Sequence, residues 1–244
     1  MDNNTNYNYD QNVVQLDDAT TASRRYMANV FLWMFVALGI SAFFAYLFAS
    51  TPSLLSMLID VNTGKPTGLG FIALFSPIAF VMLMSFGFNR ISYPVLALLF
   101  IAYAAVLGTS LSFILLIYTA ASVLSMFVTA SVLFGIMAVA GYTTHQDLTK
   151  FGSLLIMALV GVIIASLVNM FMHIEGLNMI INYVGVAIFI GLTAYNVQQQ
   201  KLISQGLEYG DASGKKLALM GALTLYLNFV NMFLFLLRIF GRRR

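Results

Sequence analysis

The sequence contains no cysteine, which excludes disulfides and every metal or redox site built on thiolates. Charge is also scarce. Asp, Glu, Lys and Arg make up 9% of the 244 residues, whereas a soluble domain has about a quarter. By contrast, 60% of the residues are hydrophobic, and the mean hydropathy is +0.89. These values exclude a soluble globular protein and indicate a polytopic membrane protein. The net charge of +3 gives no reason to expect a nucleic-acid partner.

Acidic residues are missing from the middle of every long apolar segment. A proton relay or a membrane aspartyl protease needs intramembrane carboxylates. A zinc helix would need a second histidine at the right spacing, which HIEGL at 173–177 does not supply. We therefore expect no enzyme, no metal site and no cofactor. The nine acidic residues lie outside the apolar segments: Asp2, Asp10, Asp17, Asp18, Asp60, Asp147, Glu175, Glu208 and Asp211.

Seven long apolar segments are present. Each has about 20 residues or more, enough to cross a hydrocarbon core of roughly 30 Å as a helix. The runs are continuous rather than alternating, which favours helices over a barrel. The third and fourth segments are joined without charge or proline, which predicts a tight helical hairpin. We predict an all-α integral membrane protein with seven transmembrane helices, at 27–49, 68–88, 93–117, 119–141, 151–172, 177–199 and 216–240.

The chain divides into three parts. Residues 1–24 are polar and rich in asparagine, and predict a disordered cytosolic tail. Residues 25–241 form the transmembrane domain, and 242–244 form a basic C-terminal end.

Basic residues predict the orientation. One side carries Lys65, and the other carries Arg24, Arg25, Arg90, Lys150, Lys201, Lys215 and Lys216, which indicates a cytosolic N-terminus. Seven crossings then place Arg242–Arg244 outside, against the positive-inside rule. Either the earlier helices fix the topology or the last segment does not fully cross. We favour seven crossings.

Polar residues recur at helical spacing in three segments. An amide that faces lipid tails has no partner, so these stripes should face the bundle interior. They either hold helices together, at roughly 0.6–2 kcal/mol for each hydrogen bond, or line a polar pathway. We expect His173 and Arg238 near the membrane interface, and close helix approach at glycines 135, 141, 161, 185 and 191. The stripes are Thr224, Asn228, Asn231, Phe235 and Arg238; Thr193, Asn196 and Gln200; and Ser166, Asn169 and His173.

Three stretches resemble hallmarks of the Bax inhibitor-1 family, including its bacterial YccA-like branch. They are GYTTHQDLTKFG at 141–152, GLTAYNVQQQK at 191–201 and LTLYLNFVNMFLFLLRIFG at 223–241. The resemblance covers residues 25–241. It implies three helical hairpins around a central seventh helix, and an activity described as a pH-sensitive calcium leak.

The resemblance also implies a sensor site. The family's proposed sensor is a pair of aspartates near an arginine, and these positions correspond to Asn196, Asn228 and Arg90. An amide neither titrates nor carries charge, and Ca²⁺ prefers carboxylate oxygens. We therefore expect the proton switch to be missing or relocated and the attraction for calcium to be weaker. Calcium is expected as a transported ion rather than as a cofactor.

Three functions remain open at this point. The first is an ion leak in a bacterial cytoplasmic membrane. The second is a non-conducting protein that a membrane quality-control protease or its scaffold recognises through residues 1–24. The third is a solute transporter, for which the sequence shows no broken-helix pair or inverted repeat. In every case the lipid bilayer is the main partner.

Overall fold

The computed structural model describes residues 5–60, 63–206 and 212–244. Seven of the helices in these residues are long and apolar enough to cross a membrane, which confirms the predicted spans. The first span begins at Thr21, within α1. The helices are α1 (Thr5–Ser50), α2 (Pro52–Leu58), α3 (Gly68–Gly87), α4 (Tyr93–Ile117), α5 (Ala120–Thr143), α6 (Thr149–Met172), α7 (Glu175–Gln205) and α8 (Ala212–Phe240).

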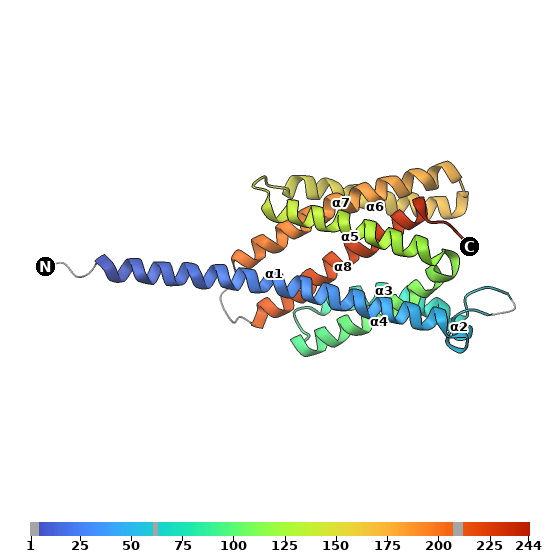
Figure 1. Cartoon of the computed structure of the whole chain (residues 1–244), viewed down its shortest axis with the longest axis horizontal. Coiled ribbons are helices and arrows are strands. Elements are labelled where there is room, and N and C mark those ends of the chain that lie inside the picture. The colour runs from blue at the N-terminus through green and yellow to red at the C-terminus, as the bar shows by residue number, and fades with distance from the viewer. Residues whose placement is uncertain (1–4, 61–62, 207–211) are drawn as a thin grey trace.

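Helix α1 begins far earlier than expected. The tail predicted to be disordered is helical from Thr5 onward, while residues 1–4 lie outside the described residues. No proline or glycine occurs between Thr5 and Leu38, so no helix-breaking residue separates the polar N-terminal part of α1 from its apolar part. Figure 1 shows α1 extending well beyond the other helices.

The short helix α2 was not predicted, because its seven residues are too few to span a membrane. Thr67 fastens the loop that follows it. The Thr67 hydroxyl accepts a hydrogen bond from the Gly70 amide (3.1 Å) and donates one to the Met57 carbonyl (2.6 Å). These bonds tie α2 to the start of α3.

Helix α8 is the core of the bundle, as predicted. It packs against α1, α4, α5 and α7. In its most apolar window 67% of the residues are buried, compared with 17% for α5 and for α6. A helix this enclosed has protein rather than lipid as its main surroundings.

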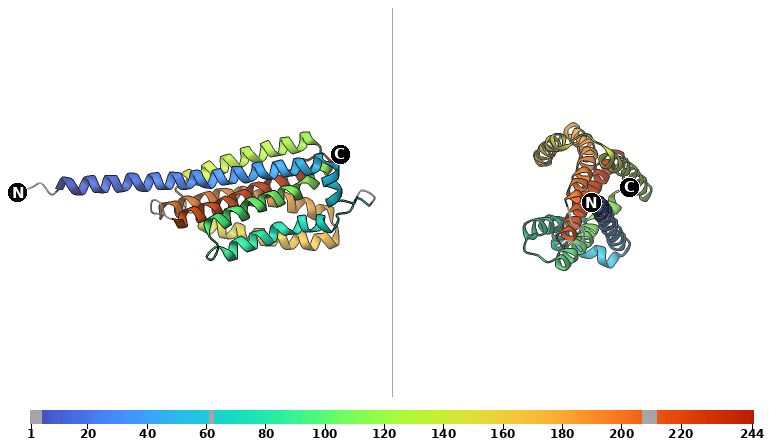
Figure 2. Two further views of the ribbon diagram at one scale, coloured as in Figure 1. Left: turned by 90° about the horizontal axis from the view of Figure 1, so that it is seen from below. Right: turned by 90° about the vertical axis from the view of Figure 1, so that its left-hand side faces the viewer.

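The other spans form two groups on either side of α8. Helices α1, α3 and α4 lie on one side, and α5, α6 and α7 on the other (Figure 2). Only the α6–α7 pair is one of the three expected hairpins. The tight hairpin predicted for α4 and α5 is wrong: α4 packs on α1 and α3, α5 packs on α7 and α8, and the two diverge from the Tyr118–Thr119 junction (Figure 1). A short connection fixes where two helices meet, but the fit of their faces decides whether they pack.

The start of α1 and the C-terminal residues lie at opposite ends of the molecule (Figure 1). Helix α8 has 29 residues, so it is about 43 Å long and long enough to cross, in agreement with seven crossings. The residues after it are tied to the α4–α5 junction. Thr119 N–H donates to the Arg242 carbonyl (3.0 Å), and Arg244 N–H donates to the Ile117 carbonyl (2.9 Å). The basic end is therefore part of the folded bundle.

Candidate functional site

Helices α7 and α8 run antiparallel, and their shared face carries most of the predicted polar residues. Two close approaches set the register: Gly221 lies against the Gln200 amide, and Gly185 lies against the Phe235 ring. Counting along both helices places Asn228 level with Thr193, near the middle of α8. Asn196 then lies about one helical turn from that level. The structure thus brings the two sensor-equivalent positions to neighbouring levels of one seam.

Several of these polar groups hydrogen-bond within their own helix. Thr193 donates to Phe189 O (2.7 Å), Thr224 to Met220 O (3.1 Å), and the Asn231 side chain to Leu227 O (2.8 Å). These bonds satisfy the side chains but do not join helices. For Thr193 on α7 and for Thr224 and Asn231 on α8, the prediction that the polar stripes hold helices together therefore does not apply. Thr193, Gln200 and Asn228 are buried, whereas Asn196, Thr224 and Asn231 are half-buried.

Asn228 is buried, and its amide nitrogen has no hydrogen-bond partner in the described part of the chain. The side-chain oxygen of Asn182 on α7 is likewise buried without a hydrogen-bond partner among the described residues. A buried polar group without a partner costs about 1–3 kcal/mol. Sequence reasoning missed Asn182, although its spacing from Gly185 and Phe189 continues the polar face of α7 by three- and four-residue steps.

Two aromatic rings separate these asparagines along the seam. Phe235 of α8 covers Gly185, and its ring centroid lies 6.0 Å from that of Phe189 on α7. Phe189 is buried. In the register of the two helices, this aromatic pair lies between the level of Asn182 and the level of Asn228. The seam is thus polar on both sides of a closed aromatic constriction.

A polar vestibule of about 560 Å³ lies beyond the constriction, at the end away from the N-terminus. Glu175 and Asn178 of α7 line it together with Arg238 of α8. The Arg238 guanidinium lies 5.6 Å from the centroid of the Phe235 ring. This end of the seam therefore presents mixed charge directly outside the aromatic pair.

The stripe on α6 also opens into this vestibule. Ser166, Asn169 and His173 line it together with residues of α7 and with Arg238 of α8. They sit at the open end of α6 beside the α6–α7 turn. The Asn169 side-chain oxygen Oδ1 accepts a hydrogen bond from Ile174 N–H (2.9 Å), which closes the helix end where His173 has φ 53°. The structure places His173 at the helix end, as expected.

The opposite end of the seam is held by hydrogen bonds between α1 and α7. The Tyr26 hydroxyl donates to the side-chain oxygen Oε1 of Gln200 (2.6 Å), and the hydroxyls of Ser23 and Ser204 are hydrogen-bonded at 2.6 Å. Tyr26 and Gln200 are both buried. Of the predicted stripe residues, Gln200 therefore makes an interhelical bond.

The α5–α6 loop is bound by the same helix. Gln198 of α7 accepts from Leu148 N–H (2.9 Å) and donates to Gln146 O (2.7 Å), while Lys201 donates to Tyr142 O (2.8 Å). Within the loop, hydrogen bonds from Thr149 lower the pKa of Asp147, and the positive charge of Lys150 lowers it further. The motifs at 141–152 and 191–201 are thus two halves of one structural unit.

Arg90 lies exposed in the turn between α3 and α4. Among the described residues, no hydrogen bond joins it to Asn196 or Asn228. Lys216 of α8 contacts this turn instead: its ammonium donates to Phe88 O (3.0 Å) and lies 5.4 Å from the Phe88 ring centroid. The sequence had indicated Lys216 only as one of the basic residues that set orientation.

Glycines explain the tightest helix contacts. A Cβ at Gly141 would meet the backbone of Ala194, and one at Gly191 would meet Leu155; Gly185 meets Phe235 as described. The expectation fails at Gly135 and Gly161, where a Cβ would have nothing within 4 Å. Helical periodicity alone does not tell which face of a lipid-exposed helix is packed.

Comparison with known proteins gives a consistent result. The family model described as "Inhibitor of apoptosis-promoting Bax1" matches residues 23–244. The "Inner membrane protein YbhL" of Escherichia coli K12 is 42% identical over 220 residues, 90% of this chain and 92% of that protein. RP147 of Rickettsia prowazekii is 38% identical over 221 residues, 91% of each chain. A membrane protein of Streptococcus pyogenes, SpyM3_0260, is 31% identical over 223 residues, 89% of this chain and 93% of its own.

Proposed function

Because the chain is a multi-pass membrane protein of the Bax inhibitor-1 family, we propose that it is a cation leak whose pathway follows the seam between α7 and α8. The observation that carries this proposal is the pair of buried polar groups without partners, Asn182 and Asn228, on either side of the Phe189–Phe235 contact. Their burial cost is explained if the seam separates and hydrates during conduction.

The chemistry of the seam favours weak selectivity and no pH gating. Asn196 and Asn228 offer neutral amide oxygens, which coordinate a cation but keep the same charge at every pH. Calcium, which prefers carboxylates, gains less from such a site than from a pair of aspartates. The pathway is closed here by the two phenylalanine rings, with the vestibule as its entrance on one side.

Orientation and location follow as part of the same proposal. The basic residues predicted for one face lie in the N-terminal part of α1 and in the connections at that end of the bundle, which supports a cytosolic N-terminus. The relative YbhL is named an inner membrane protein, which supports the cytoplasmic membrane of a bacterium.

Flux into proteoliposomes tests the leak. The purified full chain should carry calcium and monovalent cations at rates above empty vesicles, with little change between about pH 6 and pH 8 because the amides do not titrate. Asn228→Leu should abolish flux by making the middle of the seam apolar. The matched control is Asn29→Leu, which removes an exposed amide from α1 and should leave flux unchanged. Flux equal to empty vesicles throughout would rule out the leak.

A second function is favoured by the projecting part of α1. A helix that extends past the bundle (Figure 1) is accessible to a membrane quality-control protease or its scaffold, with this chain as a non-conducting regulator or substrate. Deleting residues 2–20 keeps the Ser23–Ser204 bond and should lengthen the lifetime of the protein in cells. An unchanged lifetime would count against recognition through this segment.

A further inference from the structure

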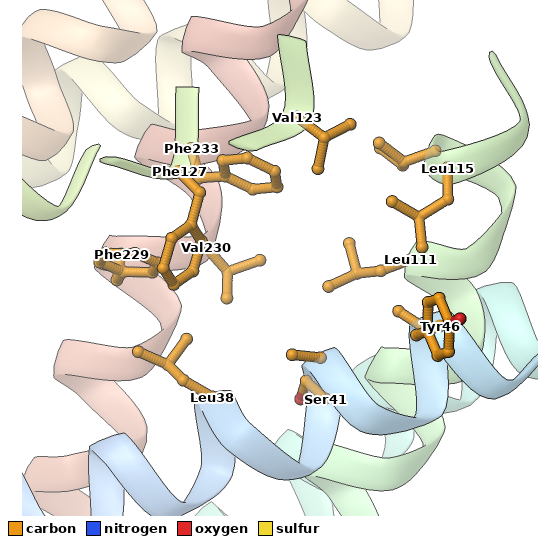
Figure 3. Close-up of a pocket in the computed structure, with 13 residues that line it drawn as sticks. Leu38, Ser41, Tyr46, Leu111, Leu115, Val123, Phe127, Phe229, Val230 and Phe233 are labelled. Atoms are coloured by element: carbon orange, nitrogen blue, oxygen red, sulfur yellow. The ribbon is translucent and has the colours of Figure 1, made fainter. Parts of the chain in front are cut away.

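An apolar cavity of about 270 Å³ lies where α4 and α5 diverge. Its walls come from α1, α4, α5 and α8, with Leu111 and Leu115 facing Phe127 and Phe233 across the space (Figure 3). The Ser41 hydroxyl at its edge is already used, because it donates to Ala104 O (2.7 Å) and is hydrogen-bonded to Tyr226. A smaller apolar cavity, of about 150 Å³, stays dry and binds apolar molecules. This cavity therefore suits an apolar occupant rather than water.

The cavity reaches the lipid-facing surface. Two residues of its lining, Tyr46 on α1 and Phe127 on α5, are 70% and 38% exposed. They stand on different walls of the cavity, on α1 and on α5. In a membrane, the surroundings of this opening are hydrocarbon chains.

A second hollow of about 270 Å³ adjoins the cavity, with Tyr46 and Leu115 lining both. It lies nearer the end of the bundle, and its lining includes Ser50 and Arg244. Ser41 and Ser50 are nine residues apart on α1, so the two hollows together extend about 14 Å along the helix. The backbone hydrogen bond from Arg244 to Ile117 (2.9 Å) fixes the arginine at this position.

We propose that the two hollows together bind one anionic phospholipid. Its phosphate contacts Arg244 and Ser50, and one acyl chain fills the cavity between α4 and α5. The arrangement matches such a lipid from headgroup to tail: a cation and a hydroxyl at the end of the bundle, an amphipathic tyrosine at the boundary, and an apolar space deeper in. This site is separate from the α7–α8 seam, so the lipid proposal does not depend on the proposed leak.

Fluorescence quenching by lipids with brominated acyl chains tests the headgroup preference. The only tryptophan, Trp33, is replaced by Phe, and Phe127→Trp places the reporter in the cavity wall. In the reconstituted full chain, brominated phosphatidylglycerol should bind about fivefold more tightly than brominated phosphatidylcholine, the effect of one basic residue near the surface. Arg244→Gln should abolish this preference and keep the backbone bond. Arg243→Gln, an exposed residue that lines neither hollow, should retain it.

A second pair of variants tests the acyl chain. Ala42→Phe fills the cavity and should reduce quenching by both lipids, whereas Val132→Phe on the lipid-facing surface of α5, 55% exposed, should not. Equal binding of the two lipids in the parent would overturn the proposal. So would an equal loss of preference with Arg243→Gln, which indicates a diffuse surface potential, or quenching that Ala42→Phe leaves unchanged.

Discussion

Tyr26 of α1 donates a buried hydrogen bond of 2.6 Å to the side-chain carbonyl of Gln200 on α7. The same Gln200 amide lies directly against Gly221 of α8. Three helices, α1, α7 and α8, therefore meet at one glutamine. The contact closes the end of the seam nearest the N-terminus.

Tyr26→Phe should destabilise the protein, because it leaves the Gln200 oxygen buried without its donor. We expect a loss of about 0.6–3 kcal/mol, the range from interhelical bonds in membranes to buried groups without partners. Thermal unfolding in detergent measures it as a lower Tm. Tyr183→Phe, at a position that is 48% exposed, is the control and should leave the Tm unchanged. Equal Tm values for the two variants would show that the bond contributes nothing.

Gly141→Ala should separate α5 from α7, because the added methyl group meets the backbone of Ala194 rather than a movable side chain. Overpacking of this kind costs typically about 1–3 kcal/mol. Gly161→Ala is the matched control on α6, since a Cβ there has nothing within 4 Å. It should be neutral or stabilise by up to about 1 kcal/mol through helix propensity. Unfolding experiments that gave both variants the same stability would refute the close approach.

Asn196→Asp combined with Asn228→Asp should create pH dependence that the parent lacks. The two positions lie about one helical turn apart along the seam, so the carboxyls share a proton and one pKa rises above its unfolded value. Such a group contributes stability below the unfolded pKa, and this stability is lost as pH rises through the folded pKa. The Tm of the double variant should fall, and its cation flux change, as pH rises from about 5 to about 8. If both profiles stay as flat as the parent's, the two positions do not interact.

Phe235→Ala should raise cation flux, because it removes one ring of the constriction beside Gly185. Loss of a packed ring costs about 3–5 kcal/mol, so flux is measured per folded protein, and Phe235→Leu provides a milder change in the same direction. Phe171→Ala, at a position that is 78% exposed, should have no effect. Unchanged flux in both Phe235 variants would place the constriction elsewhere.

The spans could be predicted from the sequence because hydropathy and length report directly on membrane crossing. The predicted segment 93–117 coincides with α4, Tyr93–Ile117. Helix α7 runs on to Gln205, beyond the predicted end at 199, because a helix that leaves the membrane becomes polar without ceasing to be a helix. The helical start of α1 was not predicted for the same reason, because its residues are polar although they continue the helix.

The packing could not be predicted in the same way. Gly141 and Ala194 meet across two helices that are not consecutive in the chain, and hydropathy contains no term for how two surfaces fit. Helical spacing did place Thr193 and Asn228 on buried faces. It could not show that Thr193 bonds its own helix while the Asn228 amide nitrogen has no partner in the described residues. That difference depends on side-chain rotamers and on neighbours from other helices.

The central position of α8 has a consequence for how the protein is made. This helix follows the seven others in the chain, so it leaves the ribosome after the spans that surround it have already been inserted. Until it arrives, Tyr226 and Asn228 are missing from the middle, and the α4–α5 junction lacks the backbone partners that Arg242 and Arg244 supply. Before it arrives, the two groups of helices contact each other through α1 and α7 but lack the central helix that both pack against. We expect the bundle to be completed only when α8 packs against α1, α4, α5 and α7.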